Sequence, residues 1–138
     1  MTEGDGRQRL LEEIVVSRRN DVRVFKLEAG SFLDGENVDI LMQDLRRKLD
    51  NERDKKVYCL DLSNVNYICS QAIGFFLTFN RLLLDRFDPD DSEGKWYGLH
   101  IILPDALREN FQATKLEKQF CIYSDMNKFL FSSMYSEL

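Results

Sequence analysis

The chain has 138 residues, of which 43% are hydrophobic and 12% aromatic, and its formal net charge is −5. This length suits one domain, and this apolar content supports a buried core rather than a disordered chain. The charge balance provides no basic stripe for a nucleic-acid partner, and no apolar run approaches the ~20 residues that span a bilayer. The amino terminus lacks the apolar core of a secretory signal, and the three cysteines show no metal-ligand spacing, so we expect a reduced, cytoplasmic setting.

The first part of the chain predicts a loose arm and two strands. Residues 1–11 are polar and contain glycine, which is typical of a flexible arm in front of a domain that we place at 12–138. Strands are expected at 13–17 and 22–27, and the polar residues 18–21 between them could close a hairpin.

An amphipathic helix is expected next. Asp34 or Asn37 can cap its start, because either side chain can accept hydrogen bonds from the first backbone N–H groups. Its predicted core face consists of apolar residues at steps of three and four: Val38, Leu41, Met42, Leu45 and Leu49. A charged loop, residues 51–56, then leads to the centre of the chain.

The centre of the chain predicts a strand, a turn and a second helix. Val57–Leu62 is a short apolar strand, and residues 63–66 have turn chemistry. The spacing becomes helical from Ser70, which is the expected N-cap. The predicted core face of this helix is Ile73, Phe76, Leu77, Asn80 and Leu84. A second apolar stripe contains Phe75 and Phe79, and it is either buried against the last helix or exposed as a surface for a partner or a homodimer.

The remaining chain continues the alternation of strand and helix. An acidic loop at 85–95 precedes a strand at 96–103, whose nearly continuous apolar run is typical of burial on both faces. Asp105 can cap a third helix, a short strand is expected at 120–123, and Ser124 can cap the last helix. The predicted order is β-β-α-β-α-β-α-β-α, which indicates an α/β domain with a mixed sheet of about five strands and about four helices.

The central segment carries a motif formed by Asp61–Leu62–Ser63, Tyr67–Ile68, Ser70 and Gly74. This motif resembles the signature of the STAS family, the anti-sigma-factor antagonists and their relatives. The resemblance is strongest at 57–77 and extends at the level of pattern over about 13–131. Ser70 falls on the phosphoacceptor position of the family. Two departures accompany these matches: Cys69 stands where the family usually has Asp, and Gln71–Ala72 where it usually has Ser-Gly or Thr-Gly.

The resemblance implies a protein–protein interaction switch and not an enzyme. Unphosphorylated, such a protein binds an anti-sigma factor that is also a serine kinase, and thereby frees a sigma factor. Phosphorylation of Ser70 would break the complex. ATP would belong to the kinase, so no cofactor and no metal are expected in this chain. The departures at Cys69 and Gln71 support an alternative, a STAS scaffold or accessory subunit of a signalling or transporter complex without phosphorylation.

Four further residues near Ser70 are candidates for partner binding. Asp61 and Ser63 end the central strand, at the sheet edge where ligands and partners gather in α/β folds. Cys69 and Gln71 flank Ser70 and belong to the same expected surface. Alternatively, Asp61 and Ser63 satisfy backbone groups of the loop, and Cys69 is a small, partly buried thiol. An enzyme or small-ligand site at this edge has the least support.

Two features elsewhere are interpreted as structural. Asp88, Asp90 and Ser92 have the spacing of calcium ligands, but Glu93 stands where an EF-hand loop needs glycine, so we favour a solvated acidic loop. His100 lies within an apolar strand and has no carboxylate or cysteine at ligand spacing. The sequence contains no P-loop, GxSxG, HExxH or GxGxxG motif.

Overall fold

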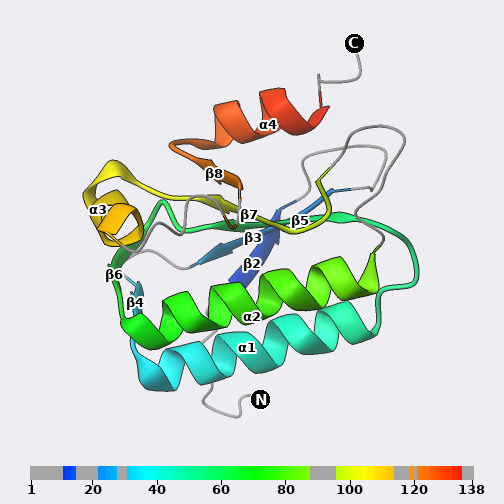
Figure 1. Cartoon of the computed structure of the whole chain (residues 1–138), viewed down its shortest axis with the longest axis horizontal. Coiled ribbons are helices and arrows are strands. Elements are labelled where there is room, and N and C mark those ends of the chain that lie inside the picture. The colour runs from blue at the N-terminus through cyan, green and yellow to red at the C-terminus, as the bar shows by residue number, and fades with distance from the viewer. Residues whose placement is uncertain are drawn as a thin grey trace, which may run out of the picture.

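A computed structural model describes residues 11–14, 22–27, 31–87, 96–113, 119 and 121–134. Residues 1–10 of the expected arm, the turn at 18–21 and the calcium-like loop residues Asp88, Asp90 and Ser92 lie outside the described residues. In chain order the elements are β2 (Leu11–Ile14), β3 (Val22–Leu27), β4 (Ser31–Leu33), α1 (Gly35–Asp50), β5 (Val57–Asp61), β6 (Val65–Ile68), α2 (Ser70–Arg86), β7 (Leu99–Ile102), α3 (Asp105–Ala113), β8 (Cys121–Tyr123) and α4 (Met126–Met134) (Figure 1).

Five of the described strands form a mixed sheet in the order β2-β3-β5-β7-β8. Only the pair β2–β3 of this sheet is antiparallel, and the other neighbours run parallel. β5 lies in the middle and all five of its residues are buried, Asp61 included, which agrees with the predicted mostly buried central strand. The α/β class and the mixed five-stranded sheet with four helices are therefore confirmed.

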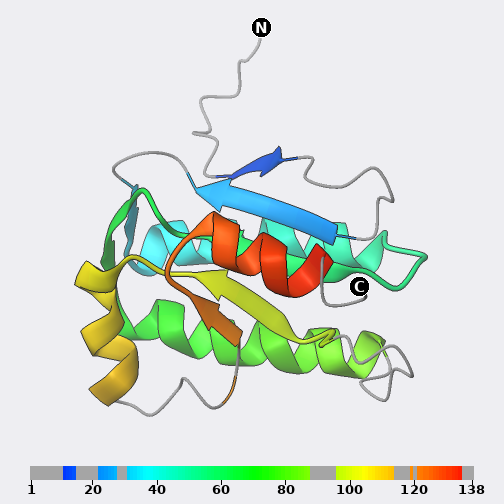
Figure 2. The same ribbon diagram turned by 90° about the horizontal axis from the view of Figure 1, so that it is seen from above.

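The helices cover the sheet in two layers. α1 and α2 lie side by side against one face, and α4 lies on the opposite face (Figures 1 and 2). Because β3, β5 and β7 are parallel, their carboxyl ends share one edge of the sheet, and the chain enters α1 and α2 from that edge. The amino ends of α1 and α2 consequently lie at the same end of the molecule as α3 (Figure 2).

A second, two-stranded sheet pairs β4 with β6 in parallel, and the sequence did not predict it as a separate sheet. The segment after residue 62 turns at 63–64 and then runs as a strand through 65–68. These strands have three and four residues, which is too short for a pattern to emerge from sequence. Their ladder fixes the segment that leads into α2.

The first helix follows the prediction closely. The Asp34 side chain accepts a hydrogen bond of 3.1 Å from the backbone N–H of Asn37, so Asp34 is the N-cap. Met42 of the predicted face is partly buried. The other four members are buried: Val38, Leu41, Leu45 and Leu49. This face packs on the sheet and on α2.

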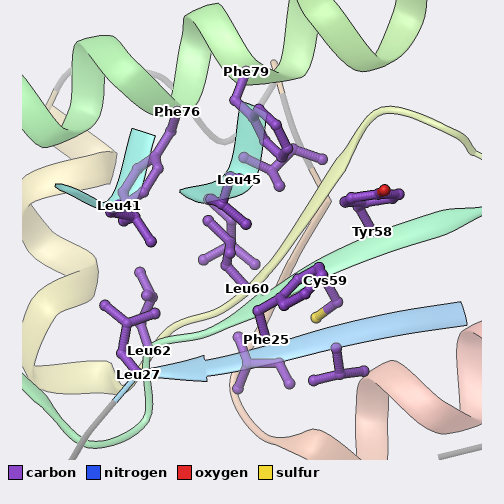
Figure 3. Close-up of a cluster of buried hydrophobic side chains, with 14 of the residues drawn as sticks. Phe25, Leu27, Leu41, Leu45, Tyr58, Cys59, Leu60, Leu62, Phe76 and Phe79 are labelled. Atoms are coloured by element: carbon purple, nitrogen blue, oxygen red, sulfur yellow. The ribbon is translucent and has the colours of Figure 1, made fainter. Parts of the chain in front are cut away.

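The core face of α2 differs from the prediction, which was wrong for Phe75 and Phe79. Phe75 is 3% exposed and Phe79 is fully buried. Figure 3 shows Phe76 and Phe79 pointing from α2 into the cluster around Leu45 and Leu60. The sheet and α1 enclose these rings, and α4 lies on the other side of the sheet (Figure 1). Neither the expected burial against the last helix nor an exposed stripe is therefore correct.

The last helix starts one residue later than expected, because its cap is Asp125 and not Ser124. The Asp125 side chain accepts a hydrogen bond of 2.9 Å from the backbone N–H of Lys128. Phe129 is fully buried and its ring packs edge-on against His100 and Tyr123. This contact holds α4 on β7 and β8.

Candidate functional site

The loop after β5 is closed by Asp61. The carboxylate Oδ1 of Asp61 accepts hydrogen bonds from the backbone N–H of Ser63 at 3.0 Å and from the Ser63 hydroxyl at 2.6 Å. Asp61 is 4% exposed, whereas Ser63 is exposed. Asp61 therefore satisfies a backbone group of the loop, as the alternative interpretation expected, whereas the Ser63 hydroxyl binds the Asp61 side chain. Asp61 shows a partner little surface.

Ser70 is the first helical residue of α2, and it is exposed. The predicted helix start is confirmed, but the prediction that Ser70 is the N-cap is wrong. Cys69 holds the cap position, with extended backbone (φ −86°, ψ 169°), and its carbonyl accepts from the N–H of Ala72 at 3.1 Å. The Ser70 side chain is thus not used as the helix cap and lies at the positive end of the helix dipole.

Cys69 leaves this cap incomplete. It makes no side-chain cap hydrogen bond, and it is partly buried against the hydrophobic core. Asp and Ser are favoured caps because their oxygens accept from backbone N–H groups, and a thiol accepts only weakly. The residue where the resembled family usually has Asp therefore contributes packing here and no carboxylate.

Gln71 ties the first turn of α2 to the first turn of α1. Its Nε2 donates a hydrogen bond of 3.3 Å to Oδ1 of Asp39. A Cβ on Gly35 would lie 2.9 Å from Gln71 Oε1, so the amide lies directly over Gly35. The two helix starts are consequently one continuous surface beside Ser70.

Tyr67 is an exposed aromatic residue of this surface that sequence reasoning missed. It lies on β6, three positions before Ser70, and it is 49% exposed. β6 buries Val65 and Ile68 and exposes Asn66 and Tyr67. In the sequence Tyr67 and Ile68 form one apolar pair. The structure shows that Ile68 is buried and Tyr67 exposed, in a strand that does not alternate strictly between buried and exposed residues.

Carboxylates outnumber cations at the end of the molecule around Ser70, where Arg108 on α3 is half-buried. Asp34, Glu36 and Asp39 on the start of α1 are exposed, and so are Asp105 and Glu109 on α3. α3 lies beside β6 at this end (Figure 1). The potential at Ser70 therefore combines the positive end of α2 with a border of carboxylates.

The opposite end of the sheet holds a buried ionic network. Glu52, 7% exposed, accepts from Arg23 Nη1 at 3.1 Å and from the Tyr58 hydroxyl at 2.9 Å, and Lys56 Nζ lies 3.2 Å from it. Arg23 also makes two hydrogen bonds to Glu13, at 2.9 and 2.8 Å, which lower the pKa of that carboxyl. Burial raises the pKa of Tyr58. Since every charge in this network has a partner, we interpret it as structural.

Other candidate chemistry is weak in the part of the chain that the structure describes. No three His, Cys, Asp or Glu side chains among these residues are grouped to hold a metal ion. None of the helices among the described residues has the length and apolar character needed to cross a membrane. Cys59 and Cys121 are free thiols, and burial raises the pKa of both.

Comparison with known proteins identifies the fold. No protein-family model and no curated protein matches this chain. The structure of the anti-sigma factor antagonist SpoIIAA in its unphosphorylated form aligns with a TM-score of 0.57 at 15% identity, over 87% of this chain and 93% of that chain. The structure of the Bacillus cell fate determinant SpoIIAA in the phosphorylated form aligns with a TM-score of 0.54 at 15% identity, over 86% of this chain and 96% of that chain. The chain therefore has a STAS-like fold.

Proposed function

We propose that this chain, which has the STAS-like fold of SpoIIAA, is a protein–protein interaction switch controlled by phosphorylation of Ser70. The observation that carries the proposal is the position of Ser70, exposed at the first residue of α2. SpoIIAA, whose fold this chain shares, has been solved in unphosphorylated and phosphorylated forms. The proposed partner is an anti-sigma factor that is also a serine kinase. In this proposal the chain acts by binding in the cytoplasm and needs no cofactor of its own.

The physical basis of the switch is a charge that the fold tolerates and an interface does not. A phosphate on Ser70 adds nearly two negative charges and three acceptor oxygens. The start of α2 favours negative charge, so the fold should remain intact. A docked partner would instead have to remove water from the dianion, which costs several kcal/mol unless a cation meets it. We therefore expect phosphorylation to change binding and not folding.

The test uses two substitutions at the same position. Ser70→Asp and Ser70→Ala baits are compared with the unmodified chain in affinity purification followed by mass spectrometry. The affinity of the recovered partner is then measured by calorimetry, with thermal melts as the folding control. We expect Ser70→Ala to bind within about twofold of the unmodified chain and Ser70→Asp to bind more than tenfold more weakly. Equal affinity for Ser70→Asp would reject the switch.

A second function has its own supporting observations. Cys69 provides no carboxylate beside Ser70, and the Gln71 amide is engaged with Asp39. Both features depart from the motif that a kinase of this kind would meet, and they favour a scaffold or accessory subunit of a signalling or transporter complex. In that case Ser70→Asp binds like the unmodified chain, and phosphoserine is absent from protein purified from its native cell.

A further inference from the structure

We infer that the partner contacts a surface formed by Tyr67, Ser70 and Gly74, with an apolar pocket for Tyr67 and Lys or Arg side chains around it. This inference rests on the proposed function, because it describes the partner that would meet Ser70. The three residues are named the Tyr67–Gly74 surface below. The supporting features are the exposed ring of Tyr67, the lack of a side chain at Gly74 and the carboxylates nearby.

Tyr67 supplies the anchor. Among the described residues the large hydrophobic side chains that are exposed are Tyr67, at 49%, and Phe131, at 71%. Tyr67 stands at the end of the molecule that carries Ser70, and Phe131 belongs to α4 on the far face of the sheet (Figure 1). Tyrosine is enriched among the residues that dominate binding energy when they enter a partner's pocket. Phe131 therefore serves as a matched exposed aromatic that the inference does not use.

Gly74 makes the approach to α2 flat. It is exposed within the helix, four residues after Ser70, and residues four apart lie on the same face. No described atom outside the local helix backbone lies within 4 Å of the position that a Cβ would occupy, so packing within the described chain does not require glycine. Glycine is unfavourable in a helix interior compared with alanine. A partner that lies closely on the backbone beside Ser70 explains why the position lacks a side chain.

The surrounding charge selects the kind of partner. Residues 34–39 and 70–74 contain three carboxylates and no Lys or Arg, and the three carboxylates, on Asp34, Glu36 and Asp39, are exposed. The hydrogen bond between Gln71 and Asp39 keeps this acidic border beside Ser70. A partner with cations facing the border is attracted at long range, and one with carboxylates there is repelled. In the inferred contact these cations are paired with the border, so a phosphate on Ser70 has to compete with Asp34, Glu36 and Asp39 for them.

The first experiment tests the charge step with a defined probe. Hexa-arginine peptide is titrated into ¹⁵N-labelled protein at low ionic strength, with hexaglutamate as the control peptide. We expect amide shifts centred on 34–39 and 67–74, and at least a threefold loss of affinity for the double variant Glu36→Gln/Asp39→Asn. The matched variant Asp50→Asn/Asp54→Asn removes two exposed charges at the far end of α1 and should bind like the parent chain. Shifts centred elsewhere, or equal affinity of both double variants, would overturn the inference.

The second experiment tests the contact itself. Baits carrying Tyr67→Ser, Gly74→Ala and Phe131→Ser are compared with the unmodified chain for retained proteins, quantified by mass spectrometry. We expect one protein retained by the unmodified chain and by Phe131→Ser, depleted at least tenfold by Tyr67→Ser and at least fivefold by Gly74→Ala. Gly74→Ala should meanwhile raise the melting temperature by about 3 °C, so its weaker binding cannot come from unfolding. Equal retention by Tyr67→Ser, or no retained protein, would overturn the inference.

The same purification separates this inference from the switch. If Tyr67→Ser loses the partner and Ser70→Asp keeps it, the contact at Tyr67 and Gly74 is supported, Ser70 lies at its margin, and the phosphorylation switch is rejected. If Ser70→Asp loses the partner and Tyr67→Ser keeps it, the switch stands and the surface is wrong.

Discussion

The ring nitrogen Nδ1 of His100 lies 3.0 Å from the hydroxyl oxygen of Tyr123, and Nε2 lies 2.8 Å from the carbonyl oxygen of Trp96. Because a carbonyl oxygen only accepts, Nε2 carries the proton and Nδ1 accepts from the tyrosine. His100 is 4% exposed, and burial lowers its pKa to about 4. The interpretation of His100 as a structural residue fits this geometry, in which a neutral ring joins β7 to β8.

Stability should therefore fall as the pH drops from about 6.5 to 4. The unfolded chain takes up a proton on His100 near pH 6.5, whereas the folded chain does so only near pH 4, so protonation favours unfolding in this window. The loss should reach roughly 3 kcal/mol at pH 4. Denaturant melts of the parent chain and of His100→Gln across this range provide the measurement. The variant keeps the carboxylates, including Glu13, so it retains their contribution to the pH dependence. Its free energy of unfolding should depend less steeply on pH than that of the parent chain. An identical pH dependence of the two proteins would contradict a buried neutral His100.

The buried network around Glu52 should be far more sensitive to truncation than a surface ion pair. Glu52→Ala leaves Tyr58 and Lys56 without their shared acceptor, and Arg23 keeps Glu13 and a 3.4 Å contact with the Tyr58 hydroxyl. We expect a loss of about 3 kcal/mol in unfolding free energy. Asp44→Ala is the control, because its contact with Arg47 is 3.9 Å long and the arginine side chain is 65% exposed. We expect that change to cost less than about 0.5 kcal/mol. Similar losses of unfolding free energy from Glu52→Ala and Asp44→Ala would show that the buried network contributes no more to stability than a surface ion pair.

Two glycine-to-alanine changes should have opposite signs. A Cβ on Gly98 would lie 2.5 Å from Asn80 Oδ1 and from the Trp96 ring, and Asn80 Oδ1 already accepts from the N–H of Leu99 at 2.8 Å. Gly98→Ala should therefore destabilise by about 2 kcal/mol or more through overpacking. Gly74→Ala meets open space within a helix and should stabilise by about 1 kcal/mol. Chemical denaturation of the two variants in parallel measures this difference, and a stabilising Gly98→Ala would be incompatible with the packing described.

The incomplete cap of α2 should be repairable. Cys69→Asp places a carboxylate at the N-cap, where it can accept from the free N–H groups of the first turn and complement the dipole. We expect a gain of about 1 kcal/mol in unfolding free energy. Ser70→Ala is the comparison and should change it by less than about 0.5 kcal/mol, because Ser70 follows the cap and is exposed. A loss on Ser70→Ala larger than the gain on Cys69→Asp would restore Ser70 as the cap.

The parts of the fold that could be predicted from sequence are those where one physical signal dominates. Five of the six residues of the run Val57–Leu62 are apolar, and burial on both faces of the sheet explains this. Asp34 was one of two predicted caps for α1, and the structure selects it because its carboxylate reaches the N–H of Asn37. The α/β class followed from the alternation of such segments.

The errors occur where several side chains compete for one role. α2 is apolar on most sides, so a period of 3.6 fits more than one face, and the packing of α1 decides that Phe75 and Phe79 point inward. Caps were misplaced by one residue at Ser70 and Ser124, because propensity cannot separate adjacent positions. Tyr67 was read with its apolar neighbour, and only the β4–β6 pairing shows that it is exposed.

The β4–β6 ladder has a consequence for hydrogen exchange. It pairs Ser31 with Val65 and Leu33 with Ile68, so its hydrogen bonds bring together the two ends of a chain segment that contains all of α1 and β5. A short ladder at the edge of a domain, closed over a long loop, belongs to the units that open locally before global unfolding. Amide hydrogens of Tyr67 and Ile68 should therefore exchange much faster than those of Cys59 and Leu60. Such opening would release the segment in front of Ser70 as an extended strand. An extended strand is the form in which the substrate cleft of a modifying enzyme would bind it.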